Sequence, residues 1–149
     1  DLFVAGADTS STTVEWAMAE LLQSPQVMKK VKGELRELLG MKMQVEESDI
    51  GQLPYLQAVV KEVLRLHSPV AMTLYRAEAT IQVQGKDCKL IPFGGGRRIC
   101  LGLPLAYRTA HLILALLLHQ FDWKLPEEAT ENCIDMTEKF GLVVSWPLH

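Results

Sequence analysis

The strongest constraint on the fold is the stretch 103–119, which is apolar around almost its whole circumference when it is drawn as a helix. Such a helix is stable when other elements of the protein cover most of its sides. Its longest uninterrupted apolar run, Leu112 to Leu118, has seven residues, whereas a bilayer-spanning helix needs ~20. The chain has 149 residues, of which 48% are hydrophobic. We therefore predict one globular domain packed around this helix.

Charge and cysteine content exclude several classes of protein. The formal net charge is −3, so the chain as a whole is not a basic nucleic-acid-binding protein. The three cysteines, Cys88, Cys100 and Cys133, are odd in number and form no CxxC pair. A disulfide scaffold and a zinc ribbon are both disfavoured by this pattern. The four histidines lack the spacing of metal-binding pairs, and we expect them to be structural.

Two further helices are predicted by apolar spacing and by their boundary residues. The first begins at Pro25, a residue suited to the first helical turn, and ends near Gly40, a plausible C-cap. The second begins at Pro54 and ends before Pro69. Its apolar face consists of Leu56, Val59, Val60, Val63 and Leu66.

Extended structure is predicted in only two places. Residues 80–84 (TIQVQ) alternate between apolar and polar side chains and are followed by a glycine, which is typical of a short strand. Residues 140–146 predict a final strand. The expected fold class is therefore mainly α with a few short β-strands.

The segment 92–102 carries the most information about chemistry. It reads PFGGGRRICLG, with three consecutive glycines, two arginines and Cys100 just before the apolar helix. Glycine reaches backbone conformations closed to other residues, and a cysteine beside arginine near a helix N-terminus favours the metal-binding thiolate. The alternative is a glycine-rich turn around a buried, inert cysteine. Phosphate-binding and dinucleotide-binding loops are excluded, because the required glycine and lysine spacings are missing.

Glu62 and Arg65 project from the same side of the predicted helix 54–66, because they are three residues apart. A pair at this spacing is either a surface ion pair of little energetic value or a partly buried pair that fixes the helix to another segment. Since Glu62 lies at the margin of the apolar face, we expect both side chains to be substantially buried.

The N-terminal residues allow two interpretations. Thr12 and Glu15 have the spacing of a capping box, which would start a helix at that point. Alternatively, a longer helix runs from about Leu2, small Ala5 and Gly6 make room for a ligand, and hydroxyl side chains loosen the backbone hydrogen bonds. Local propensity alone favours the capping box.

Three motifs follow one another in the order AGADTS (residues 5–10), EVLR (62–65) and FGGGRRICLG (93–102). This order resembles the cytochrome P-450 family of haem-thiolate monooxygenases. The segments LPYLQAVVKEVLRLHSP, GRRICLGLPLA and FDWKL are similar to the plant group that includes the geraniol hydroxylases. The resemblance implies the C-terminal portion of that fold: half of the distal helix, the helix with the ExxR pair, the cysteine loop and the long buried helix. It also favours the longer N-terminal helix over the capping box.

On the proximal side of haem b, the resemblance implies that Cys100 is the axial thiolate ligand of the iron. Phe93 matches the residue that packs beside this ligand. Gly96 and Gly102 match the glycines of its tight turn. Arg98 and Arg76 match the two residues that contact the haem propionates.

On the distal side, Asp8 and Thr9 match the acid–alcohol pair that relays protons to iron-bound oxygen, and Ala5 and Gly6 match residues that face haem and substrate. Glu62 and Arg65 match the pair that braces the core under the cysteine loop. Residues 70–74 and 140–142 fall where the family lines its substrate pocket.

The chain departs from the family pattern in its extent. It is expected to be a single partial domain over residues 1–149, about a third of the family's domain. The resemblance leads us to expect that this portion does not include the N-terminal membrane anchor that places the family in the endoplasmic reticulum. A second stretch is missing between about residues 85 and 86, and with it an arginine that would complete a triad with Glu62 and Arg65.

The function implied by the resemblance is insertion of one oxygen atom from O2 into a small apolar molecule, with monoterpenoids as the candidate class. Electrons come from NADPH through a partner reductase, and no nucleic acid is involved. The alternative is a non-catalytic, truncated remnant that binds haem weakly or not at all. We expect no activity from this chain alone.

Overall fold

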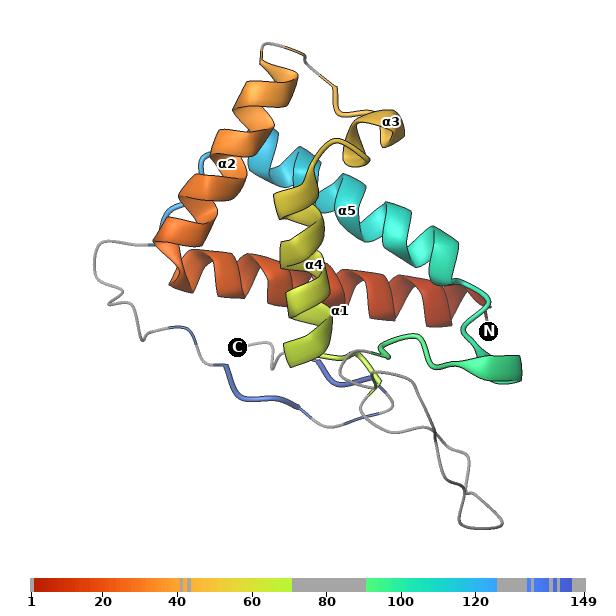
Figure 1. The fold of residues 1–149 in the computed structure, drawn as a ribbon. Helices are drawn as coiled ribbons and strands as arrows, with labels where there is room; N and C mark the ends of the chain where they lie inside the picture. The colour runs from red at the N-terminus through yellow and green to blue at the C-terminus, as the bar shows by residue number, and fades with distance from the viewer. Residues whose placement is uncertain are drawn as a thin grey trace, which may run out of the picture.

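The computed structural model describes residues 2–40, 42, 44–70, 91–125, 134, 136–139, 141 and 143–145. In chain order these residues form α1 (Leu2–Gln23), α2 (Pro25–Leu39), α3 (Glu47–Ile50), α4 (Pro54–Leu66), the 3-10 helix η1 (Gly96–Arg98) and α5 (Leu103–Gln120). Figure 1 shows α4 crossing in front of α1, while α5 runs behind α4 and its first turns lie near the N-terminal end of α1. The predicted mainly helical class is confirmed.

Helix α1 is continuous from Leu2 to Gln23, so the prediction of a helix start at the Thr12 capping box is wrong. The hydroxyl groups bond within the helix instead: Thr9 Oγ1 donates to the Ala5 carbonyl at 2.7 Å, and Thr13 Oγ1 donates to the Thr9 carbonyl at 2.8 Å. The threonine hydroxyls thereby find hydrogen-bond acceptors within the helix and do not end it. The long-helix alternative is confirmed.

Helices α2 and α4 form where spacing and proline predicted them. Pro25 occupies the first turn of α2, and Gly40 caps its end with φ of 53°, a left-handed conformation that favours glycine. In α4 the buried face is Leu56, Val60, Val63 and Leu64. Leu66, predicted for this face, is exposed, because the face turns toward Leu64 in the last turn.

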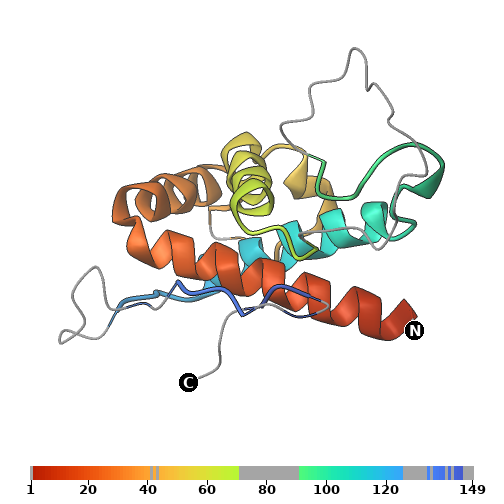
Figure 2. The same cartoon turned by 90° about the horizontal axis from the view of Figure 1, so that it is seen from below.

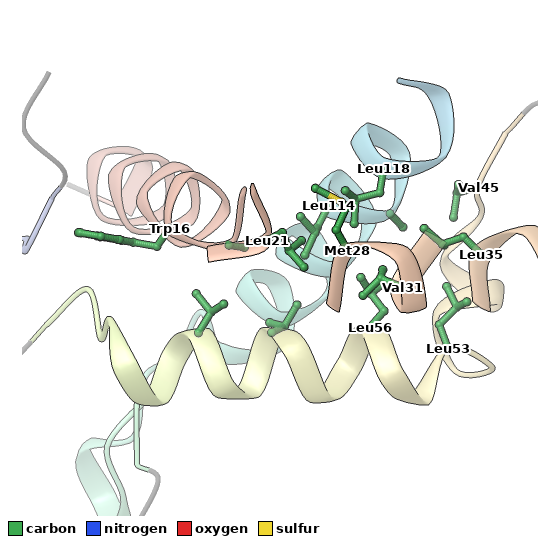
Figure 3. Packing of buried hydrophobic residues seen from close by; sticks show 14 of the residues in the cluster. Trp16, Leu21, Met28, Val31, Leu35, Val45, Leu53, Leu56, Leu114 and Leu118 are labelled. Atoms are coloured by element: carbon green, nitrogen blue, oxygen red, sulfur yellow. The ribbon is translucent and has the colours of Figure 1, made fainter. Parts of the chain in front are cut away.

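The core lies between α1, α2, α4 and α5. Trp16, Leu35, Leu56 and Leu114 are at most 1% exposed within it. In Figure 3, Leu21 of α1, Met28 of α2 and Leu114 of α5 approach one another above α4. Burial of these apolar side chains is the main source of stability for such a bundle.

The N-terminus of α4 is capped by a side chain from another helix. Leu53 at the N-cap position supplies no side-chain hydrogen bond. The Glu34 carboxylate of α2 accepts the backbone N–H of Tyr55 at 2.8 Å and that of Leu56 at 2.9 Å. These two donors have no partner within the helix itself. Glu34 therefore fixes α4, and with it the Glu62–Arg65 pair, against α2.

Helix α5 is less enclosed than its sequence predicted. Ala110, His111, Leu114, Ala115 and Leu118 are buried, whereas Leu105 in the first turns is 69% exposed. The expectation of burial on most sides therefore holds for the second half of the helix and is wrong for the first half. Among the residues that the structure describes, none of the helices is long and apolar enough to cross a membrane.

The predicted final strand is wrong for the described part of residues 140–146. Gly141 and Val143 are bends, and Lys139 pairs with Ser145 in an isolated antiparallel bridge. The chain thus turns back on itself rather than running straight. The predicted strand at residues 80–84 lies outside the described residues. The described C-terminal residues run beside α1 (Figures 1 and 2).

His111 makes stability depend on pH. Its ring is fully buried, its Nδ1 bonds the Tyr107 carbonyl, and its Nε2 has no hydrogen-bond partner among the described residues. Burial, helped by the charge of Lys61, lowers the pKa of His111 below its usual 6.5, although the Tyr107 contact opposes this shift. At acidic pH the unfolded chain therefore binds more protons at this position than the folded chain. The free energy of unfolding falls as pH drops from the unfolded pKa of His111, about 6.5, toward its lower folded pKa.

We therefore expect His111→Phe to reduce the acid sensitivity of folding. Urea unfolding is measured for the original chain and the variant between pH 7.5 and pH 5.5. The free energy of unfolding of the original chain should fall relative to that of the variant as pH decreases. A difference that stays constant over this range would contradict the assignment.

Candidate haem-ligand site

The cysteine loop is a tight turn closed by backbone hydrogen bonds. The Cys100 N–H donates to the Phe93 carbonyl at 2.9 Å, and the Gly94 N–H donates to the Ile91 carbonyl at 3.1 Å. Gly94 and Gly96 have φ of 71° and 68°, in the left-handed region where other residues are strained. The prediction that Gly96 permits the turn is consistent with this geometry.

The Cys100 thiol is free and exposed. The alternative of a buried, inert cysteine is therefore wrong. The Cys100 carbonyl accepts the N–H of Leu103 at 3.3 Å, so the loop runs directly into the first turn of α5. Phe93, on the other side of the loop, is partly buried against the hydrophobic core. This contact anchors the loop while the thiol stays accessible.

Gly102 has a different role from the one predicted. Its φ of −82° and ψ of 0° belong to the ordinary right-handed region, so the turn does not require glycine there. A Cβ atom at this position would lie 3.8 Å from the Cys100 sulfur. What glycine contributes is free space on one side of the thiol.

The first turns of α1 present the predicted distal residues at the surface. Ala5, Gly6 and Asp8 are exposed, and Thr9 is half-buried. Phe3 is 92% exposed beside them, and an added Cβ at Gly6 would meet no atom within 4 Å. Figures 1 and 2 both place this end of α1 at the same end of the molecule as η1 and the start of α5.

Glu62 and Arg65 form the predicted pair, but the expectation of burial is wrong. Arg65 Nε lies 2.8 Å from Glu62 Oε2, and a second guanidinium nitrogen lies 2.7 Å from Oε1. Their side chains are 55% and 47% exposed, respectively. The core face of α4 is formed by other residues, and this pair projects away from it. The Arg65 hydrogen bonds hold the pKa of Glu62 below its usual range.

Several predicted site residues cannot be placed. Arg76 and residues 71–74 lie outside the described residues, as do Phe140 and Leu142. Val70 is exposed at the edge of the described part. Arg98 is exposed in η1, next to the glycines of the turn.

The exposed residues at this end of the molecule fit a large, flat, apolar group with a metal at its centre. Cys100 offers a soft sulfur donor of the kind that binds iron, and Arg97 and Arg98 supply positive charge for carboxylate substituents. Leu101 is 91% exposed beside the thiol. Such isolated apolar side chains around one donor are expected where a hydrophobic cofactor packs.

Comparison with known proteins decides the family. The family model described as cytochrome P450 matches residues 1–86 and 77–147. The chain belongs to the cytochrome P-450 family. The solved structures agree: a zebra fish cytochrome P-450 crystallised with progesterone has a TM-score of 0.78 and 30% sequence identity. It covers 96% of this chain, which in turn covers 42% of that structure.

Plant relatives show the same partial coverage. Cytochrome P-450 76T24 of Catharanthus roseus is 41% identical over 97% of this chain, and geraniol 8-hydroxylase of the same plant is 40% identical over 97%. This P-450 chain spans 38% of the length of each of these relatives. The resemblance to a plant, geraniol-hydroxylase-like P-450 is thereby confirmed.

Sequence reasoning missed the side-chain contacts that join distant segments of this P-450 chain. Glu34 was not among the residues identified from sequence, although it caps α4. His67 was expected to be structural, and it contacts both Glu20 and Glu138. Both contacts join segments far apart in the chain, so the spacing of residues within one segment does not predict them. A charged residue beside the apolar stripe of a helix was the only available signal.

Proposed function

We propose that this chain is the haem-ligand portion of a monooxygenase that inserts one oxygen atom from O2 into a small apolar molecule. Haem b would supply the oxygen-activating chemistry, and NADPH would supply electrons through a partner reductase. The observation that carries the proposal is the exposed Cys100 thiol in a turn closed by the Cys100–Phe93 hydrogen bond. A thiolate ligand favours O–O bond cleavage at haem iron.

In this proposal the residues of the chain hold and orient the reacting groups. Cys100 would ligate the iron, and Arg98, with Arg76, would bind the haem propionates. Ala5 and Gly6 would leave space for haem and substrate. Phe93 anchors the ligand loop in the core, which limits the movement of the thiol.

Asp8 and Thr9 would deliver the two protons that the reaction consumes for each oxygen molecule. The Thr9 hydroxyl donates to the Ala5 carbonyl at 2.7 Å, so its single proton is engaged within the helix. Delivery of a proton toward the haem side would require this hydroxyl to rotate away from Ala5. Asp8, exposed one residue earlier, would reload it from solvent.

The proposed substrate class is an apolar small molecule of monoterpenoid size. Two relatives from different plants are named geraniol 8-hydroxylase, and they are 40% and 38% identical to this chain. Another relative, at 40% identity, is named 7-ethoxycoumarin O-deethylase. The shared character of these named substrates is a small apolar body with a polar oxygen.

We further propose that a family segment is missing at residues 85/86. The alignment with cytochrome P-450 76C1 of Arabidopsis thaliana covers the whole chain and runs over 195 residues, although the chain has 149. The exposed Glu62–Arg65 pair is consistent with a missing third partner. These observations favour the second candidate function for the chain by itself, in the form of a remnant that ligates haem through Cys100 but does not catalyse oxygenation.

A pair of chimaeras tests the function and the missing segment together. The matching part of geraniol 8-hydroxylase from Catharanthus roseus is replaced either by this chain as it stands or by this chain with the relative's extra stretch restored at 85/86. With reductase, NADPH and geraniol, we expect oxygenated product from the restored chimaera and at most free-haemin background from the other.

The control for this experiment is the restored chimaera carrying Cys100→Ser, which should be inactive. A restored chimaera that folds and binds haem but forms no product would contradict the proposed monooxygenase function. Equal turnover by both chimaeras would contradict the missing segment.

A further inference from the structure

His67, which follows the last residue of α4, joins three segments of the chain. Its Nε2 atom lies 2.7 Å from Glu20 Oε1 of α1, and its Nδ1 atom lies 3.4 Å from Glu138 Oε1 of the C-terminal segment. Its ring stacks on Trp16 with centroids 4.0 Å apart and planes inclined by 1°. The His67 side chain is 12% exposed. We call these four residues the His67 cluster.

The protonation chemistry of this cluster is unusually restricted. An ionised carboxylate only accepts hydrogen bonds, and a neutral imidazole has a single N–H to donate. With one proton on the ring, one nitrogen lone pair would face a carboxylate oxygen. Only the doubly protonated ring donates to both Glu20 and Glu138, and the face of Trp16 also stabilises a cation. The doubly protonated ring is therefore the form that satisfies both carboxylates.

We propose that His67 is a pH-operated latch that ties Glu138 and the described C-terminal residues near it to α1 and α4. The doubly protonated ring holds Glu138, and loss of one proton releases this longer of the two carboxylate contacts. The ionisable groups that face the ring are Glu20 from α1 and Glu138 from the C-terminal segment. Imidazole is the side chain whose charge ordinarily changes between pH 5 and pH 8.

The segment has few other described attachments, so the latch matters to its position. Gln23 Nε2 donates to the Ile134 carbonyl at 3.3 Å, and the Val144 N–H donates to the Pro69 carbonyl at 2.9 Å. Val144 is buried, and Met136 packs against the core. Pro69 is two residues beyond His67. Release of the ring from Glu138 should therefore also weaken the Val144–Pro69 hydrogen bond.

Hydrogen–deuterium exchange of the 149-residue chain without haem tests the latch independently of the proposed function. Protection factors of the Val144 amide, corrected for intrinsic exchange, are compared at pH 5.5 and pH 8.5. We expect protection to fall about tenfold at the higher pH, the size of effect of one charge-assisted hydrogen bond. Glu138→Gln should remove this pH dependence, and so should His67→Gln.

The matched control is His119→Gln, since the His119 ring bonds a backbone carbonyl, that of Lys42, and no carboxylate among the described residues. This variant should keep the tenfold change. Protection of the Leu35 amide in α2 reports whether His67→Gln still folds, and if it does not, Glu138→Gln decides. Equal Val144 protection at both pH values, or an unchanged pH dependence in Glu138→Gln, would overturn the proposal.

Discussion

Replacing Cys100 by serine should abolish thiolate-type haem binding by this chain. The sulfur is exposed on a turn that the Cys100–Phe93 backbone hydrogen bond closes. Two glycines in the left-handed conformation give this turn its shape. Serine keeps the size and the hydrogen-bonding backbone, so the turn should persist. Changes to residues behind a metal ligand alone cost about 10–100-fold in affinity, and loss of the ligand itself should cost at least that. Haemin titration followed by absorption measures the change.

The matched control for this prediction is the double variant Cys88→Ser/Cys133→Ser. It removes the other two thiols of the chain and should leave haem affinity unchanged. If Cys100→Ser bound haemin as tightly as the original chain and with the same spectrum, the assignment of Cys100 would be refuted. Loss of binding only in the double variant would refute it as well.

Replacing Glu34 by alanine should lower the free energy of unfolding by about 2–3 kcal/mol. The carboxylate accepts two backbone N–H groups at the start of α4, at 2.8 and 2.9 Å. These donors would be left without a protein partner at a half-buried helix end. Glu34→Gln should have an intermediate effect, because the amide oxygen replaces only one of the two acceptors. Urea unfolding monitored by circular dichroism measures each change.

Glu37→Ala is the control for the effect of removing a glutamate from α2. Glu37 is exposed on the same helix, so its replacement should change stability by less than about 0.5 kcal/mol. Equal destabilisation by Glu34→Ala and Glu37→Ala would show that helix propensity or charge explains the loss. The hydrogen bonds from Glu34 to the start of α4 would then make no measurable contribution to stability.

Local sequence signals were enough to predict the helices whose ends carry a proline or a glycine. Pro25 and Gly40 bound α2, Pro54 begins α4, and the apolar stretch before Gln120 forms α5. For α1 the local signal pointed the wrong way. The Thr12–Glu15 spacing suggests a start, but packing of Trp16, Ala17 and Leu21 in the core stabilises the second half of the helix. The threonine hydroxyls bond inside the first half, which continues the helix toward Leu2. Tertiary packing overrides local preference in such cases.

The candidate site was predictable to a similar extent. The loop around Cys100 is specified by residues within one short segment, so its glycines and its thiol were identified from sequence. Burial of Glu62 and Arg65 depends on what covers their side of α4, and their position three residues apart carries no information about that. The same limit applies to Glu34 and His67, whose partners are distant in the chain.

The central claim, that Cys100 presents a thiolate to haem iron, is tested most directly by the reduced, CO-bound absorption spectrum of the Cys88→Ser/Cys133→Ser chain. In this variant Cys100 is the sole remaining cysteine. The account predicts the red-shifted Soret band that marks a haem with an axial thiolate. A spectrum of the histidine-ligated or unligated kind, from a chain that retains its helical circular dichroism, would contradict it.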